Sequence, residues 1–594
     1  GVYHMGARGG DFPADAPPPG PASPTPAQPS LLETSVERER HPVVSSERNI
    51  RYSNPPRRHL HSSAHPEVDA HVRYASSLGD RRPTLQRRLD SRPNPTVHPP
   101  SAARRERPKR KEFASRSPPR ISTMGSRLRR VQDADLKDKV VLVRVDHNCV
   151  KDGVIHDTFR VDQSIATLYN IVERGGRPIL MTHVNRPYDK KSRQLTCRDE
   201  DAVTAVVRYL QHKLGVVFAV PTFRIEPARG ILDVDTSVNW LIEDLKHRRV
   251  GGVYLPNTRW FEGEEGLAAA DADAARARFA TQLAGLADVF VNDAFGSWQP
   301  HVSTYHVAKM LPSFAGLLMQ KEVDALSALT TPVRPFLAVI AGSKLDTKMG
   351  CIKAIAEKAD HVMLGGQLYN AYIAAKFGVK INGVDESDVA IARTQLLVPE
   401  VERKLVPLGV VIESDALDGC GCVPVAGKCG VIGDGMMVRA KRLADLKPGE
   451  TTGYFLDVSA ESFKDARVTE VIANAKTIFV NAVMGLTSAG FHEGTAALDA
   501  AIASNVEARK YFGGGDTLQE FKSLSPGLYM TALECPSYYL FTGGGTVLKA
   551  LELGDATKLP CVELLLAAEG ETRSKAPAPK CMALESCDCG PTPA

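Results

Sequence analysis

The feature that most constrains the fold is a regular alternation of short apolar runs and amphipathic segments that starts at residue 139. The run KVVLVRV (139–145) precedes a segment with helical apolar spacing and a glycine stop (161–176). RPILMTH (177–183) and the segment 199–215 repeat this pattern. Short apolar strands that alternate with helices of ten or more residues predict a parallel sheet covered by helices on both faces.

This alternation occurs in two series. The first ends with DVFVND (288–293) and LPSFAG (311–316), and the second runs from PFLAVIAG (335–342) to SYYLFTGGGTVLKALELG (537–554). A helix at 317–329 and the residues Thr330, Thr331 and Pro332 lie between the series. We therefore expect an α/β fold of two lobes, each a mostly parallel doubly wound sheet, joined by a hinge helix with an interdomain cleft.

The first 123 residues are rich in proline and arginine and poor in apolar runs, which predicts a disordered basic extension. Arginine pairs that begin at Arg57, Arg81, Arg87 and Arg104 are compatible with a transit segment, an RNA-binding arm or simple solvation. We expect a cytoplasmic protein, or a protein of a plastid or another organelle if the extension is a transit segment. Met124 opens the patterned region, so the functional protein could begin there.

Charge and cysteine content exclude several classes of protein. The net charge of +5 is concentrated in the extension, so the body is not a basic nucleic-acid binder. No run of 18 uncharged apolar residues is present, and we expect no membrane span. The eleven cysteines suit a reducing compartment, and the clusters Cys420, Cys422, Cys429 and Cys581, Cys587, Cys589 lack the spacing of a zinc ribbon.

Polar residues follow the apolar runs of the first series. They are Asp146, Asn148, Arg160, His183, Arg186 and Arg259. Because the carboxyl ends of parallel strands face one crevice, we expect these residues to converge there. Arginine forks match carboxylate and phosphate oxygens, and a histidine adds a donor that can be charged near neutral pH. Arg144 lies within a strand, so we expect it to pair with a neighbouring carboxylate instead.

The second series carries glycine turns and two lysines. These are Lys344, Lys348, GGGDT (513–517) and TGGG (542–545). Glycines before a helix let backbone N–H groups approach phosphate. Asp516 could hold Mg²⁺, Thr517 could cap the helix, and the two lysines would share one face if a helix begins there. No GxxxxGK[ST] motif is present, which excludes a P-loop enzyme.

Taken as an ordered set, RVDxN, HxxRP, NxRxxxGEE, VNDAFG, GxKxxxK, GGGDT and TGGG resemble the phosphoglycerate kinase family over roughly residues 139–565. The resemblance implies reversible, Mg²⁺-dependent phosphoryl transfer between 1,3-bisphosphoglycerate and ADP, giving 3-phosphoglycerate and ATP. It implies a carboxyl group as phosphoryl acceptor and a role in carbon metabolism such as glycolysis. Small molecules would be the partners of a monomer, with no membrane and no nucleic acid involved.

The resemblance also assigns roles to residues. Phosphoglycerate would be bound by Asp146, Asn148, Arg160, His183, Arg186 and Arg259. Nucleotide phosphates or their metal would be bound by Lys344, Lys348, Gly514, Gly515, Asp516 and Thr517, with Asp516 as the metal ligand. Arg160, Lys344 and Gly544 would act on the transferring group.

The resemblance divides the chain into five parts. Residues 124–312 would form the phosphoglycerate-binding lobe and residues 313–548 the nucleotide-binding lobe with the hinge helix. Residues 549–570 would return to the first lobe, residues 571–594 would form a flexible tail, and residues 1–123 remain the extension.

The chain departs from the family pattern at several places. Gln299 and Pro300 stand where the family has a His-Arg pair, and His301 follows them. NAVMGLTSAGF (481–491) lacks the glutamate expected to bind ribose. In the adenosine region, GYFLDVSAES (453–462) lacks the glycine that precedes Leu-Asp in the family, and Phe455 would fill the space that this glycine leaves open. Nucleotide preference therefore stays open. The alternative function is that of a noncatalytic, phosphoglycerate-kinase-like binding or assembly protein, and an RNA-associated protein that uses the basic extension is a further alternative.

Overall fold

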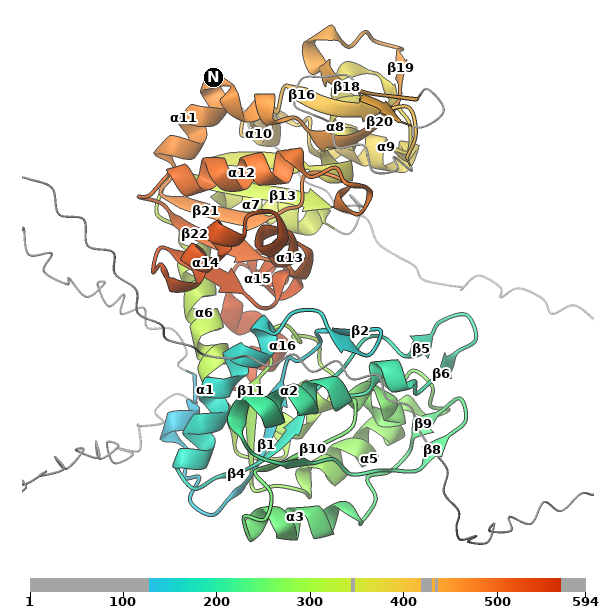
Figure 1. The fold of residues 1–594 in the computed structure, drawn as a ribbon, viewed down its shortest axis with the longest axis vertical. Helices are drawn as coiled ribbons and strands as arrows, with labels where there is room; N and C mark the ends of the chain where they lie inside the picture. Colours follow the sequence, from blue (N-terminus) through green and yellow to red (C-terminus); the bar gives the residue numbers. More distant parts are fainter. Residues whose placement is uncertain (1–127, 343–347, 418–429, 433–435, 568–594) are drawn as a thin grey trace, which may run out of the picture. The chain divides into compact units, whose positions relative to one another are not determined.

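The computed structural model describes residues 128–342, 348–417, 430–432 and 436–567 (Figure 1). The expected extension, the expected tail, Lys344 and both cysteine clusters lie outside the described residues.

A six-stranded sheet forms the first half of the described chain. Its strand order is β12-β11-β1-β4-β10-β7, and every neighbouring pair is parallel, as the sequence predicts. The strands are β1 (Val140–Val145), β4 (Arg177–Met181), β7 (Phe218–Ala219), β10 (Gly252–Tyr254), β11 (Val289–Asp293) and β12 (Ser313–Ala315). Because β12 pairs with β11, this sheet extends three residues beyond the boundary expected at residue 312.

Helices cover both faces of this sheet. Alternate residues of β1 point to opposite faces, since side chains alternate along a strand. Val141 and Val143 pack with α1 (Phe159–Glu173) and α2 (Thr204–Leu214). Leu142 packs on the other face with α3 (Val238–Lys246) and α5 (Ala272–Ala284). The first half is therefore a doubly wound sheet, and Figure 1 shows these helices on its two sides.

A five-stranded parallel sheet forms the second half. Its strand order is β14-β13-β21-β22-β23. The strands are β13 (Phe336–Gly342), β14 (His361–Gly365), β21 (Thr477–Asn481), β22 (Arg509–Gly513) and β23 (Tyr538–Phe541). The helices are α7 (Met349–Lys358), α8 (Gly366–Phe377), α11 (Ala466–Asn474), α12 (Glu493–Ser504), α13 (Gly515–Leu524), α14 (Pro526–Glu534) and α15 (Gly544–Leu553).

The expected connector is α6 (Leu317–Thr330), and it contacts both sheets. Its first turn is held by Asp293 at the end of β11, whose Oδ1 accepts the backbone N–H groups of Leu318 (2.9 Å) and Met319 (3.1 Å). Val323 and Leu326 lie in the same core cluster as Phe336 of β13. A single helix thus carries the chain from one sheet to the other.

An antiparallel sheet was not predicted from the sequence. Its strand order is β17-β18-β16-β20, formed by β16 (Val410–Ser414), β17 (Gly430–Ile432), β18 (Met436–Arg442) and β20 (Tyr454–Val458). Ile412, Val438 and Leu456 form a small core there with Phe491. The remaining strands are β2 (Val150–Lys151), β3 (Val154–Ile155), β5 (Tyr188–Asp189), β6 (Gln194–Leu195), β8 (Ile225–Glu226), β9 (Gly230–Ile231), β15 (Lys380–Ile381) and β19 (Thr451–Thr452). The remaining α-helices are α4 (Glu262–Glu265), α9 (Glu386–Gln395), α10 (Pro399–Glu402) and α16 (Pro560–Glu563).

The last described residues lie against the first ones. The backbone N–H of Arg129 donates to the carbonyl of Leu565 (2.7 Å), and the Arg129 guanidinium donates to the carbonyl of Leu564 (2.7 Å). The segment around α16 therefore contacts residues that precede the first sheet. Within the described part of the chain, no helix combines the length and apolar character that crossing a membrane requires.

Candidate functional site

A cavity of about 1240 Å³ receives residues from both sheets. Asn148 and Arg160 line it from the six-stranded half, and Lys348 lines it from the five-stranded half. The glycine turn before α13 contributes Gly514, Gly515, Asp516 and Thr517, and the turn before α15 contributes Gly545. Residues predicted from separate parts of the sequence are therefore brought to one cavity.

Arg160 reaches from the first half toward the second. It is the second residue of α1, and its Nη1 lies 3.6 Å from Oδ2 of the buried Asp146 and 3.3 Å from the carbonyl oxygen of Asn148. A Cβ atom built on Gly515 would lie 3.8 Å from Arg160 Nη2. The guanidinium is thus held by two residues that follow β1 while it faces the start of α13.

His183 lies near Arg160 but is uncharged. Its Nδ1 lies 2.9 Å from Arg144 Nη2, and because arginine only donates, Nδ1 is the acceptor and the imidazole proton is on Nε2. Burial and the nearby positive charges of Arg144 and Arg259 hold the pKa of His183 well below its usual range. The expectation of a histidine that can be charged near neutral pH is therefore wrong.

Arg144 is fully buried, but it does not pair directly with a carboxylate. Its Nε donates to Ser303 Oγ (2.9 Å), and its Nη1 donates to the carbonyl of Val145 (2.5 Å). Ser303 Oγ in turn donates to Glu264 Oε1 (2.5 Å). The expected partner is thus reached through a hydroxyl group, and Arg144 orients His183 rather than facing the cavity.

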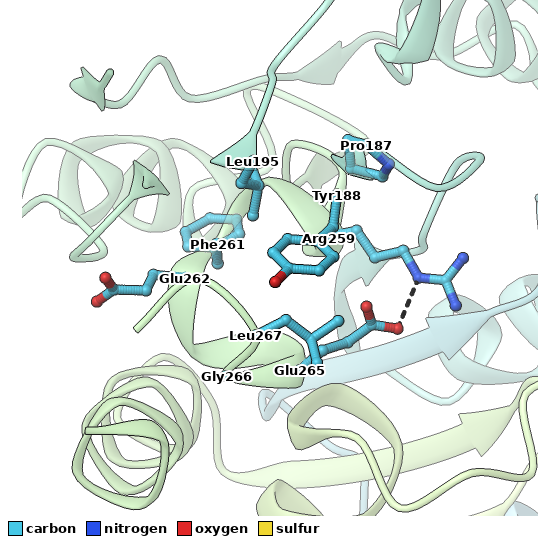
Figure 2. A pocket seen from close by; sticks show the side chains of 9 residues that line it. All are labelled: Pro187, Tyr188, Leu195, Arg259, Phe261, Glu262, Glu265, Gly266 and Leu267. Carbon is cyan, nitrogen blue, oxygen red and sulfur yellow. Dashed lines mark hydrogen bonds and ion pairs between the residues drawn. The ribbon is translucent and has the colours of Figure 1, made fainter. Parts of the chain in front are cut away.

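Arg259 is engaged by protein groups. Its Nε donates to Glu265 Oε1 (3.1 Å), and its Nη1 donates to the carbonyl of Asn185 (2.6 Å). Figure 2 shows the pair between Arg259 and Glu265 beside Tyr188, at a small cavity of about 10 Å³. Glu265 Oε1 also lies 3.4 Å from His301 Nε2. Glu265 therefore offsets part of the positive charge expected from Arg259.

Arg186 is exposed and forms no hydrogen bond or ion pair with another described residue. It follows Asn185, whose φ of 52° lies in the left-handed region that Asn tolerates better than most residues. The Asn185 N–H donates to Asn148 Oδ1 (2.9 Å), and its Nδ2 donates to Asp201 Oδ1 (2.8 Å). The turn is thus fixed while the arginine side chain stays available.

Lys348 lies just before α7, which begins at Met349. Lys344 lies outside the described residues, so the expectation that the two lysines share a helix face stays a prediction. Lys348 Nζ donates to the carbonyl of Ala341 and to Asn481 Oδ1 (3.1 Å), and burial lowers the pKa of Lys348. Asn481 ends β21 and was missed, although it follows an apolar run as the predicted residues do.

The two glycine turns touch each other. Gly514 has a φ of 127°, and a Cβ atom built on Gly544 would lie 2.3 Å from Gly514 Cα. A Cβ atom on Gly543 would lie 2.5 Å from Cα of Gly296 in the first half. Helix α13 begins at Gly515, so Thr517 is its third residue and does not cap it as expected.

The start of α13 is suited to phosphate and to a metal that accompanies it. Free N–H groups and the positive end of the helix dipole favour anions there. Asp516 lies in this first turn, is exposed and lines the large cavity. The described residues contain no cluster of three or more His, Cys, Asp or Glu residues that could hold a metal. One carboxylate fits Mg²⁺, which usually keeps several waters and binds substrate phosphates.

Glu322 of α6 is a further buried residue that sequence analysis missed. Its Oε1 accepts from the backbone N–H and from Oγ1 of Thr542, each at 2.9 Å, directly before the second glycine turn. Burial raises the pKa of Glu322 to about 8. The two residues are 220 positions apart, so no local pattern could have paired them.

Comparisons with known proteins agree on one family. The sequence model of the family described as phosphoglycerate kinase matches residues 131–553. The phosphoglycerate kinase of Dictyoglomus turgidum is 30% identical over 443 residues, which cover 73% of this chain and 97% of that protein. That of Pseudothermotoga lettingae is 31% identical over 434 residues, which cover 71% of this chain and 95% of that protein.

Two solved structures share the fold. The phosphoglycerate kinase from Coxiella burnetii has a TM-score of 0.54 and 24% identity, covering 74% of this chain and 99% of that chain. The phosphoglycerate kinase from Pyrococcus horikoshii has a TM-score of 0.55 and 21% identity, covering 74% of this chain and 98% of that chain.

Proposed function

Since the chain belongs to the phosphoglycerate kinase family, we propose that it catalyses reversible phosphoryl transfer between 1,3-bisphosphoglycerate and ADP, giving 3-phosphoglycerate and ATP. The observation that carries this proposal is the single cavity lined by Arg160 from one half and by Lys348 and the start of α13 from the other. Phosphoryl transfer requires both substrates to meet around one migrating group, and this cavity is large enough for two small molecules.

The six-stranded half is proposed to bind phosphoglycerate. Arg160 and Arg186 would supply positive charge, and Arg259 would contribute the charge that Glu265 leaves uncompensated. Neutral His183 would donate a hydrogen bond from Nε2, because its Nδ1 is occupied by Arg144. The buried Asp146 and the half-buried Asn148 would orient Arg160, and Asn148 would also orient the turn that carries Arg186.

The five-stranded half is proposed to bind the nucleotide. Lys348 and Lys344 would pair with phosphate oxygens, and Gly514 and Gly515 would present backbone N–H groups at the start of α13. The carboxylate of Asp516 would hold Mg²⁺, which supplies positive charge to the phosphates when bound. Thr517 would contribute its hydroxyl, and Gly544 would let the second turn approach the migrating group.

The mechanism requires positioning and positive charge more than proton transfer. The phosphoryl acceptor of the reverse reaction is a carboxylate, which needs no general base. Arg160 would stabilise the equatorial oxygens of the migrating group, because its guanidinium already faces the start of α13. The apolar and glycine surfaces around it would exclude water, which otherwise competes as acceptor.

A coupled assay tests the proposal. The full chain is incubated with 1,3-bisphosphoglycerate and ADP or GDP, with and without Mg²⁺, and nucleoside triphosphate is measured. We expect triphosphate formation that depends on Mg²⁺ and on both substrates. A folded protein that binds both substrates without turnover would contradict the proposal and favour the noncatalytic alternative.

A further inference from the structure

Three carboxylates line the large cavity, and two of them already have a role. They are Asp157, Asp516 and Glu520. Asp157 Oδ1 lies 2.8 Å from Lys522 Nζ, so its charge is compensated within the protein. Asp516 is the proposed metal ligand. Glu520 of α13 forms no ion pair with another described residue, and its charge faces the cavity without a partner cation.

The Glu520 side chain is held in place by one contact. Thr487 Oγ1 donates to Glu520 Oε1 at 3.2 Å. Thr487 starts a short 3-10 helix (Thr487–Ala489) and lines the same cavity, and both residues are half-buried. Among the described residues, Glu520 Oε2 has no hydrogen-bond partner. The carboxylate is therefore oriented by the protein and still has acceptor capacity for a ligand.

The position of Glu520 along α13 fits the length of a nucleotide. Glu520 follows Asp516 by four residues, so both lie on one face of the helix, about 6 Å apart along its axis. A nucleoside diphosphate whose terminal phosphate lies at the start of α13 would extend its sugar along this face. Two neighbouring sugar hydroxyls are donors, and an ionised carboxylate accepts from both.

The cavity that Glu520 lines also has apolar lining residues. Met484, Leu486 and Leu456 line the cavity next to Thr487. Ligand sites typically combine such apolar walls with a few placed polar groups, and flat apolar walls suit a nucleobase. Phosphate, sugar and base would thus meet a helix start, a carboxylate and an apolar wall in the order in which a nucleotide carries them.

We propose that Glu520 binds the ribose hydroxyls of the nucleotide and makes the site selective for ribonucleotides, with Thr487 as the residue that positions its carboxylate. This inference rests on the proposed function, in which the cavity binds ADP or ATP. It assigns the ribose contact to α13, the helix that also presents Asp516.

The test compares ADP with 2′,3′-dideoxy-ADP, which keeps the phosphates and the base. Dissociation constants are measured by calorimetry, and KM and kcat by the coupled assay, for the wild type, Glu520→Gln and the control Glu534→Gln. Glu534 is exposed at the end of α14 and does not line the cavity. We expect Glu520→Gln to weaken ADP binding about tenfold and dideoxy-ADP binding less than twofold, because a hydrogen bond to a charged group is lost only with ADP.

Thr487 provides a second measurement. Thr487→Val should raise KM for ADP a few-fold with kcat unchanged, and Thr487→Ser, which keeps the hydroxyl, should restore it. Equal weakening of both nucleotides by Glu520→Gln, or no weakening of either, would overturn the inference while turnover persists. Selective ADP binding without phosphoryl transfer would instead leave the inference standing and sink the proposed reaction.

Discussion

The two halves of the molecule present positive charge to the cavity in different ways. The six-stranded half uses a long side chain, that of Arg160 near the start of α1, whereas Arg259 lines the small cavity and Arg186 lines neither cavity. The five-stranded half combines the ammonium group of Lys348 with the main chain of the glycine turns that open α13 and α15. We therefore expect substitutions that remove a charged side chain to affect the six-stranded half most. Substitutions that add a methyl group to a glycine should affect the five-stranded half most.

The largest expected effect is that of Arg160→Ala. Removing a cation that faces the migrating group should lower kcat by about 10²- to 10³-fold, since preorganised charge is usually the largest catalytic contribution. The free energy of unfolding should fall by about 1 kcal/mol, because the guanidinium is partly exposed and loses one ion pair, to Asp146, and one long hydrogen bond, to the Asn148 carbonyl.

Steady-state kinetics and chemical denaturation measure the two quantities. The matched control is Arg208→Ala on α2, which is exposed and does not line the cavity. A loss of stability large enough to account for the loss of turnover would contradict the proposed catalytic role of Arg160.

Gly514→Ala tests the main-chain half. The φ of 127° is unfavourable for alanine, and its Cβ would lie 2.8 Å from Asn481 Nδ2. We expect the free energy of unfolding to fall by about 1–3 kcal/mol and the affinity for ADP to fall with it. Gly527→Ala is the control, because a Cβ there meets nothing within 4 Å. Unchanged ADP affinity would show that the turn does not approach the nucleotide.

Arg186→Ala should give an intermediate effect confined to one substrate. The side chain has no partner among the described residues, so the unfolding free energy should stay within about 0.5 kcal/mol of the wild-type value. KM for 3-phosphoglycerate should rise about tenfold, as expected for one lost charge-assisted hydrogen bond, while KM for ATP stays constant. A rise in KM for ATP alone would contradict the assignment of Arg186 to the phosphoglycerate-binding half.

The smallest effect concerns acid stability of the first half. His147 is fully buried, its Nδ1 lies 2.8 Å from the Tyr254 hydroxyl, and burial lowers its pKa to about 3. The unfolded state therefore takes up a proton below pH 6.5 that the folded state does not, and the stability is lost as pH falls from 6.5 toward 3. His147→Gln should remove this dependence, about 1 kcal/mol over the first pH unit below 6.5.

Denaturation of both proteins between pH 7 and pH 5 measures the difference. Asp499 in the second half has the opposite effect on the pH dependence of stability. Burial raises its pKa to about 7, so the stability that its protonated form contributes is lost as the pH rises toward 7. An unchanged pH slope in His147→Gln would show that this histidine does not set the acid limit.

The fold was largely predictable because its parallel strands are continuous apolar runs and its helices keep a regular spacing. β1, β4 and β13 all began within one residue of the expected runs. The antiparallel sheet was not predicted because its strands, such as β18, show the period-two alternation of a half-buried strand only in part. The site was less predictable, because a residue's partners depend on distant segments. Glu265 offsets part of the Arg259 charge, and burial together with Arg144 lowers the pKa of His183; the motifs contain these residues but do not show that they meet.

Three glycine-bearing segments meet with almost no atoms between their backbones. Gly296, Gly514 and the pair Gly543–Gly544 approach so closely that a methyl group on Gly543 or Gly544 would overlap a neighbouring Cα. The distances between these segments are set by direct backbone contact, with no side chain between them. Any side chain at Gly543 or Gly544 would push two main-chain segments apart, so substitutions that reshape this part of the cavity have to lie around the glycines rather than at them.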